Sequence, residues 1–193
     1  TSESEKICSA IRELGVEAND IYDLVNSKKS YKAAIPILVN SLKEGVDDPS
    51  LKEGIIRALG AKEARGTEAS TVLINEFWRL PPEDWVMRWT IGNTISIIAE
   101  DSDFGEISKV VTDPINGKSR EMFVLSLGRV RLREAEDLLI ALLEDDEVAA
   151  HALDALGKKK SKNARDKIAL LVNHSRSLIR KEASKALKRI DQQ

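Results

Sequence analysis

The sequence predicts an all-α protein built as a solenoid of five helical hairpins behind an N-terminal capping segment. Helix-favouring Ala, Leu, Ile, Glu, Lys and Arg dominate the chain, whereas only 4% of its 193 residues are aromatic. Similar segments recur about every 30 to 35 residues, and short polar turns separate them. Because one hairpin cannot bury its own apolar face, successive hairpins must stack on one another.

The first 30 residues resemble the repeats least. They predict a helix over Glu3–Leu14, followed by a short apolar turn, "IYDLVN". A divergent terminal unit is expected, because the end of a stack must cover the core and face water. We therefore assign residues 1–30 to an N-terminal helical cap and residues 31–193 to the repeat array, the two forming a single structural domain.

Each hairpin begins with a helix that carries apolar residues three to four and seven to eight positions in, as helical periodicity requires. These first helices are expected to start at Ala34, Ala69, Phe104, Ala135 and Ala164. The turns that follow contain residues that stop or cap helices: "DDPS", "PPED", "DPINGKS", "EDDE" and "NHSRS".

The second helices align more closely. They read "LKEGIIRALG", "MRWTIGNTIS", "SREMFVLSLG", "VAAHALDALG" and "IRKEASKALK". The first, fifth, eighth and ninth columns are mostly apolar or small and lie on one side of a helix, so we expect them in the core. The second column is basic in four of five repeats: Lys52, Arg88, Arg120 and Arg180.

The apolar-then-basic start and the Leu-Gly end of the second helix resemble the HEAT-like repeat family, particularly the short-unit branch found in phycobilin lyases. The resemblance covers Tyr31 to Ile190 and implies a right-handed α-α superhelix whose second helices line a concave groove. Tetratricopeptide and ankyrin repeats have a similar period, but their Trp–Leu-Gly–Tyr and Thr-Pro-Leu-His signatures are absent.

All three tryptophans fall in one window, "FWRLPPEDWVMRW". With the apolar columns directed inward, the third and seventh columns should face the groove, and Trp89 is the one aromatic residue in them. A tryptophan in a polar row is a candidate binding anchor, because indole gives much contact area for little lost entropy. The candidate binding-groove residues are Trp89, Trp85, Glu53, Arg57, Asn93, Glu121, Leu125 and Asp154.

A structural alternative remains for the same window. Trp89 could fold over Trp85, one turn earlier, so that both cover the turn containing Pro81 and Pro82. Trp78 follows the apolar position Phe77 and is expected to pack.

The sequence predicts no catalytic residue, metal site or cofactor. His151 and His174 are the only histidines, and neither has a partner at metal-ligand spacing. The HEAT-like enzyme deoxyhypusine hydroxylase binds iron through His-Glu pairs, and no such pair occurs here. Cys8 lies among isoleucines and is expected to pack, and no phosphate-binding glycine-rich loop is present.

The composition and charge of the chain indicate its cellular compartment and bear on its partners. No apolar run is long enough to span a membrane, the start lacks the order of a secretory signal, and a lone Cys8 cannot form an internal disulfide. These features favour a cytoplasmic protein. Residues 158–193 hold 12 Lys and Arg against three acidic residues, so charge is uneven along the chain.

We therefore expect a non-enzymatic scaffold or adaptor whose groove binds another protein or a peptide. One alternative is nucleic-acid binding, as in the HEAT-like alkylpurine DNA glycosylases. The acidic groove residues count against it, because phosphate binding favours basic residues along the whole track. A second alternative is a tetrapyrrole (bilin) lyase or chaperone, as in the branch that the chain resembles.

Overall fold

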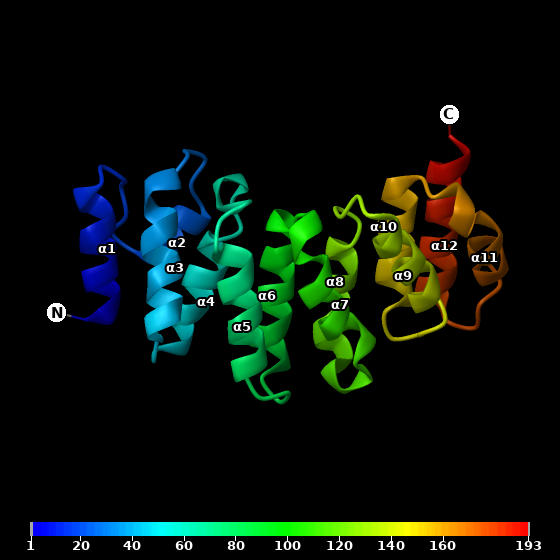
Figure 1. The fold of residues 1–193 in the computed structure, drawn as a ribbon, viewed down its shortest axis with the longest axis horizontal. Coiled ribbons are helices and arrows are strands. Elements are labelled where there is room, and N and C mark those ends of the chain that lie inside the picture. The colour runs from blue at the N-terminus through cyan, green and yellow to red at the C-terminus, as the bar shows by residue number, and fades with distance from the viewer. Residues whose placement is uncertain (1, 193) are drawn as a thin grey trace. The chain divides into compact units, whose positions relative to one another are not determined.

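The computed structural model describes residues 2–192, which form twelve α-helices and five short 3-10 segments and contain no strand. The all-α prediction is confirmed. Backbone contacts group the chain into two compact units, Thr1–Ile98 and Ala99–Gln193 (Figure 1). The 3-10 segments are Lys32–Ala34, Lys62–Ala64, Asp101–Asp103, Pro114–Arg120 and Lys162–Ala164.

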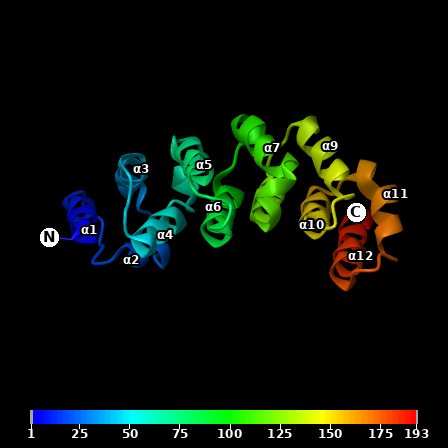
Figure 2. The same cartoon turned by 90° about the horizontal axis from the view of Figure 1, so that it is seen from below.

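The first unit is a two-layered packing of six helices: α1 (Glu3–Glu13), α2 (Ile21–Val25), α3 (Ile35–Glu44), α4 (Pro49–Ala58), α5 (Ala69–Arg79) and α6 (Trp85–Ile98). Helix α3 contacts α1 and α5, whereas α4 contacts α2 and α6. First helices therefore pack beside first helices, and second helices beside second helices, as Figure 2 shows for this unit.

The segment that the sequence predicts as an apolar turn is helix α2. This helix forms because its first turn is capped reciprocally. The Asp20 carboxylate accepts from the Tyr22 amide at 2.8 Å, and the Asp23 carboxylate accepts from the Asp20 amide at 3.0 Å. This arrangement satisfies backbone donors that would otherwise be orphaned at the start of the helix. Ile21 and Leu24 are buried in consequence, with α2 packed against α4.

The second unit is centred on α10. Its helices are α7 (Phe104–Thr112), α8 (Glu121–Ser126), α9 (Arg133–Leu142), α10 (Ala149–Lys159), α11 (Arg165–Leu171) and α12 (Ser177–Asp191). Helix α10 contacts α8, α9 and α12, and α11 packs on α12. The second helices α8, α10 and α12 thus form a continuous row within this unit.

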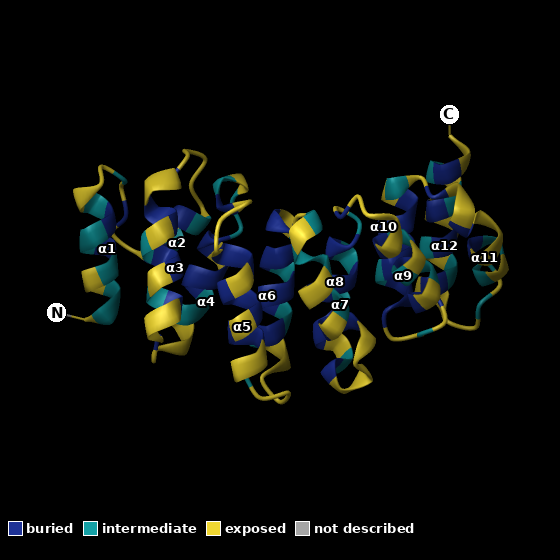
Figure 3. Ribbon diagram, in the orientation of Figure 1, coloured by how far each residue is buried: buried dark blue, intermediate teal, exposed yellow. Residues whose placement is uncertain are grey.

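Burial follows the repeat columns that the sequence defines (Figure 3). The fifth column is fully buried in every repeat: Ile55, Ile91, Phe123, Ala152 and Ala183. The ninth column is buried in four repeats and half-buried at Leu187. The third and seventh columns are half-buried or exposed except at Ala150, so the sequence pattern locates both the core and the more accessible helix face.

The Leu-Gly end of the second helix permits close packing between repeats. A Cβ on Gly157 of α10 would lie 3.0 Å from Ala186 Cα on α12, and a Cβ on Gly128 would lie 3.3 Å from Ala155 Cβ on α10. A methyl group at either position would be crowded against the next second helix, which would have to give by a few tenths of an ångström. Glycine here lets the second helices of this unit approach one another.

Basic residues of the second column form hydrogen bonds within the protein. Lys52 on α4 donates to Glu76 on α5 at 2.8 Å, and Glu76 is only 4% exposed. Arg120 donates to Asp145, which lies in the turn of the next hairpin, at 2.7 Å, and is only 2% exposed. Two of these residues therefore link consecutive hairpins within a unit, and Arg180 donates to the carbonyl of His174 in the turn before its own helix.

Candidate protein-binding surface

Five of the predicted groove residues lie on α4 and α6 of the first unit. Glu53 and Arg57 form an ion pair on α4, in which Nε and Nη2 of Arg57 both donate to Glu53 Oε1, at 2.9 and 2.7 Å. Arg57 is exposed and Glu53 is half-buried. Because α4 packs against α6, this pair belongs to the same helical layer as Trp89 and Asn93.

The two tryptophans of α6 differ in exposure. Trp85 is the first residue of the helix and is 50% exposed, while Trp89, one turn later, is half-buried, as is Asn93. Both indoles therefore keep accessible surface. A partly exposed indole beside charged side chains has the composition typical of protein-binding hot spots.

Three predicted groove residues lie in the second unit, where Glu121, Leu125 and Asp154 are half-buried on α8 and α10. Asp154 accepts from Lys158 and from Arg189 of α12, each at 2.7 Å. Burial raises the pKa of Asp154, but hydrogen bonds from these two cations outweigh it and leave the pKa below its ordinary value. The carboxylate thus has two cationic partners and links α10 to α12.

The sequence does not reveal the contacts that the two histidines make with the preceding repeat. His151 Nε2 on α10 lies 3.8 Å from Glu121 Oε2 on α8, and His174 Nε2 lies 3.0 Å from Asp146 Oδ1. Each pair joins residues about 30 positions apart, which is one repeat, so helical spacing alone could not reveal them. Within residues 2–192, no group of three or more His, Cys, Asp or Glu residues is placed to hold a metal ion.

The α5–α6 turn exposes more apolar surface than the sequence analysis anticipated. Trp78 is 43% exposed although its ring edge packs on the buried Phe77, with centroids 5.1 Å apart and planes at 87°. The guanidinium of Arg88, on α6, lies 3.9 Å from the Phe77 ring centroid. Trp78 is therefore supported from beneath by a cation–aromatic stack but keeps part of its indole in solvent.

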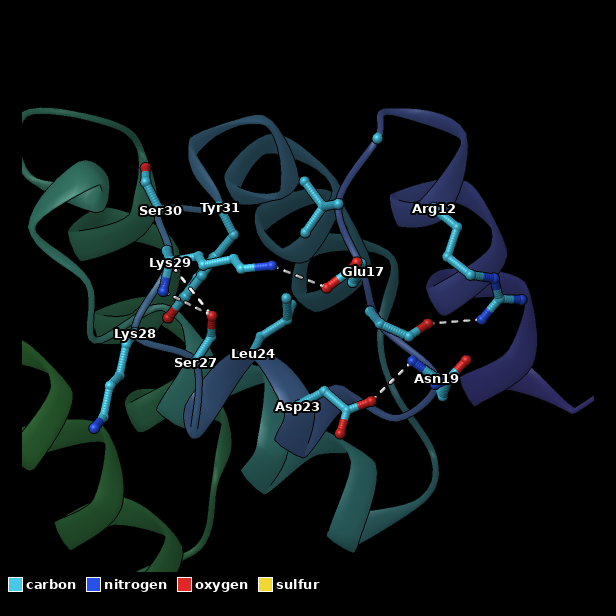
Figure 4. Close-up of a pocket in the computed structure, with 13 residues that line it drawn as sticks. Arg12, Glu17, Asn19, Asp23, Leu24, Ser27, Lys28, Lys29, Ser30 and Tyr31 are labelled. Carbon is cyan, nitrogen blue, oxygen red and sulfur yellow. Dashed lines mark hydrogen bonds and ion pairs between the residues drawn. The ribbon is translucent and has the colours of Figure 1, made fainter.

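An open cavity of about 930 Å³ lies between α1 and the loops around α2 (Figure 4). Two of its three basic lining residues, Arg12 and Lys29, have partners within the protein. Arg12 donates to the Ala18 carbonyl at 2.7 Å and to Glu5, and Lys29 lies 3.2 Å from Glu17. The remaining lining mixes Lys28 and Asp23 with uncharged polar and apolar residues, so the cavity presents no concentrated charge of one sign.

No model of a known protein family matches the chain, and the curated proteins contain no significantly similar sequence. Within residues 2–192, no helix combines the length and the apolar character needed to cross a bilayer.

Proposed function

We propose that this protein is a non-enzymatic scaffold that binds a segment of another protein on the face formed by its second helices. In this proposal the hairpins continue one another as a right-handed, HEAT-like superhelix, and Trp89 and Trp85 anchor the partner. The observation that carries the proposal is the accessible indole surface on α6 in the layer that also holds the Glu53–Arg57 pair. Large aromatic anchors flanked by polar groups dominate the energetics of many interfaces.

The recurring basic residues of the repeat bear on the nucleic-acid alternative. Two of the recurring basic residues, Lys52 and Arg120, are engaged with carboxylates inside the protein. They offer little to a phosphate backbone, and the nucleic-acid alternative is less favoured for that reason. The bilin alternative draws on the resemblance alone.

The test is affinity capture with three forms of the protein: wild type, Trp89→Ala, and Leu178→Ala as a matched control. Leu178 is an exposed apolar residue on α12, 57% accessible, which controls for generic loss of hydrophobic surface. A specific partner should be retained by wild type and Leu178→Ala and lost by Trp89→Ala. With the purified partner, the Trp89 variant should weaken binding by about 10- to 100-fold, as for a hot-spot tryptophan.

Because Trp89 is half-buried, Trp89→Phe and a thermal melt are needed to separate binding from folding. A folded Trp89→Ala protein that captures the same partners with unchanged affinity would contradict the proposal.

A further inference from the structure

The α5–α6 turn displays apolar and acidic side chains together. Trp78, Trp85 and Val86 are 43%, 50% and 57% exposed, and Glu83 and Asp84 between them are exposed as well. We call these five residues the indole turn. Only 4% of the residues are aromatic, yet two indoles at this turn are partly exposed to solvent. Exposed apolar patches on soluble domains mark interaction sites.

The turn is pre-organised. Pro81 and Pro82 open it, and the Asp84 amide donates to the Pro81 carbonyl at 3.0 Å, which closes a four-residue turn. The Asp84 carbonyl in turn accepts from the Arg88 amide at 3.0 Å as α6 begins. Proline restricts the backbone, and the Phe77–Arg88 stack supports Trp78 from below. A partner would therefore lose little entropy by ordering this surface.

The charge of the indole turn selects the partner. Within residues 2–192, no ion pair engages Glu83 or Asp84, whereas the neighbouring Arg79 lies 3.6 Å from Glu76. The turn thus carries two exposed carboxylates within a few residues of two partly exposed indoles. Both attract cations: carboxylates by Coulomb interaction, and indoles through the negative face of the ring system.

Arginine satisfies both features better than lysine does. Its planar guanidinium stacks on aromatic rings and pairs bidentately with carboxylates, and its weaker hydration lowers the cost of leaving water. Apolar side chains next to such an arginine would cover Val86 and the exposed indole edges. Nucleic acid and anionic membranes are disfavoured by Glu83 and Asp84, which would repel them.

We propose that the indole turn binds an arginine-containing apolar segment of a partner protein. This inference rests on the proposed scaffold function and names the partner's chemistry, with Trp85 shared between the two surfaces. Trp78, Glu83 and Asp84 belong to the indole turn alone, and Trp89 belongs to the α4–α6 face alone, so the two proposals can fail separately.

The experiment titrates the whole protein with blocked synthetic peptides, by calorimetry and by tryptophan emission. The probe is a peptide of alternating arginine and leucine. Its controls replace every arginine with glutamate, every arginine with lysine, or every leucine with glutamine. We expect saturable binding of the arginine peptide with a blue shift in emission, weaker binding of the lysine and glutamine forms, and none of the glutamate form.

Variants then locate the site. Trp78→Ala and Trp85→Ala should each weaken binding of the arginine peptide about tenfold or more, and Glu83→Gln with Asp84→Asn should weaken it and flatten its salt dependence. The matched control Leu178→Ala should bind as wild type does. All these side chains are at least 43% exposed or classed as exposed, so the variants are expected to fold, and circular dichroism checks this.

Several results would overturn the inference: no saturable binding of the arginine peptide, equal binding of the glutamate peptide, or equal losses in Leu178→Ala and Trp78→Ala. Loss in Trp89→Ala with full binding in Trp78→Ala would move the site to the α4–α6 face, overturning this inference while leaving the scaffold function supported. Trp78-dependent binding to phosphatidylcholine vesicles, without peptide binding, would identify a lipid surface instead and would also overturn it.

Discussion

Replacing Arg120 with methionine should destabilise the second unit by about 2 to 4 kcal/mol, because the methionine keeps the apolar stem but removes every hydrogen bond. Arg120 donates to Asp145 at 2.7 Å, to the Gly117 carbonyl at 3.1 Å and to the Val111 carbonyl at 3.3 Å. We count roughly 1.5 to 3 kcal/mol for the charged pair and roughly 0.5 to 1 for each carbonyl. Asp145 can rehydrate in the variant, since its side chain is 35% exposed, and this lowers the total.

The assay is urea unfolding at neutral pH, followed by far-ultraviolet circular dichroism. All three tryptophans lie in the first unit, so tryptophan emission, followed in parallel, is a probe located in that unit. Arg133→Met is the matched control: Arg133 is 84% exposed and lies 3.9 Å from Asp137, and its loss should change stability by less than about 0.5 kcal/mol. A loss below about 1 kcal/mol in Arg120→Met would refute the reasoning.

The same pair predicts a pH dependence. Burial raises the pKa of Asp145, but the hydrogen bond from Arg120, the Glu147 amide and the Arg120 charge together hold it below the ordinary value of 3.8. A carboxyl whose pKa is depressed by folding stabilises the protein above its unfolded pKa and loses that contribution as the pH falls through its folded pKa. The deficit of Arg120→Met should therefore shrink as the pH falls below 3.8. In an Asp145→Asn background the deficit should be smaller at neutral pH and should change little with pH, because the amide does not titrate.

Two further predictions concern packing. Gly157→Ala should lower the free energy of unfolding by about 1 to 3 kcal/mol, because the new methyl group meets Ala186 Cα at 3.0 Å. Gly105→Ala on α7 is the control: its methyl group meets nothing within 4 Å, so the change should be neutral or stabilising by up to about 1 kcal/mol. Equal melting temperatures for the two variants would contradict the close approach of α10 and α12. Cys8 is fully buried and its thiol pKa is raised, chiefly by desolvation, so a maleimide should label it slowly and faster in mild urea. Labelling at the rate of free cysteine without denaturant would contradict the burial of this α1 side chain.

Much of the fold follows from the sequence because its signals are local. Helical periodicity predicts ten hairpin helices, and they begin within two residues of the expected positions: α5 begins at Ala69 and α7 at Phe104, as predicted. Capping chemistry explains the start of α4, where the Asp48 carboxylate accepts from the amides of Ser50 and Leu51. The helix α2 was missed because its five residues are too few for periodicity to register.

The candidate site depends on geometry between helices, which the sequence encodes only indirectly. The pattern places Trp89 in an accessible column, and the structure leaves it half-buried. The prediction that Trp78 packs is correct for its contact with Phe77, but it misses the exposed remainder of the indole. That exposure depends on how neighbouring elements pack around α5, which no spacing of residues within one helix specifies. How the groove residues of the two units combine remains a prediction.

Side-chain contacts between neighbouring hairpins join residues about one repeat apart in the sequence. Lys52 reaches a partner 24 residues ahead, Arg120 one 25 residues ahead, and the hydroxyl of Thr94 bonds the Ile56 carbonyl 38 residues back. Chains dominated by such nearby contacts close small loops and fold rapidly, since little entropy is lost before contacts form. We therefore expect the first unit to fold while the ribosome is still synthesising α10. The surface that carries Trp78, Trp85 and Trp89 can then form before the chain is released.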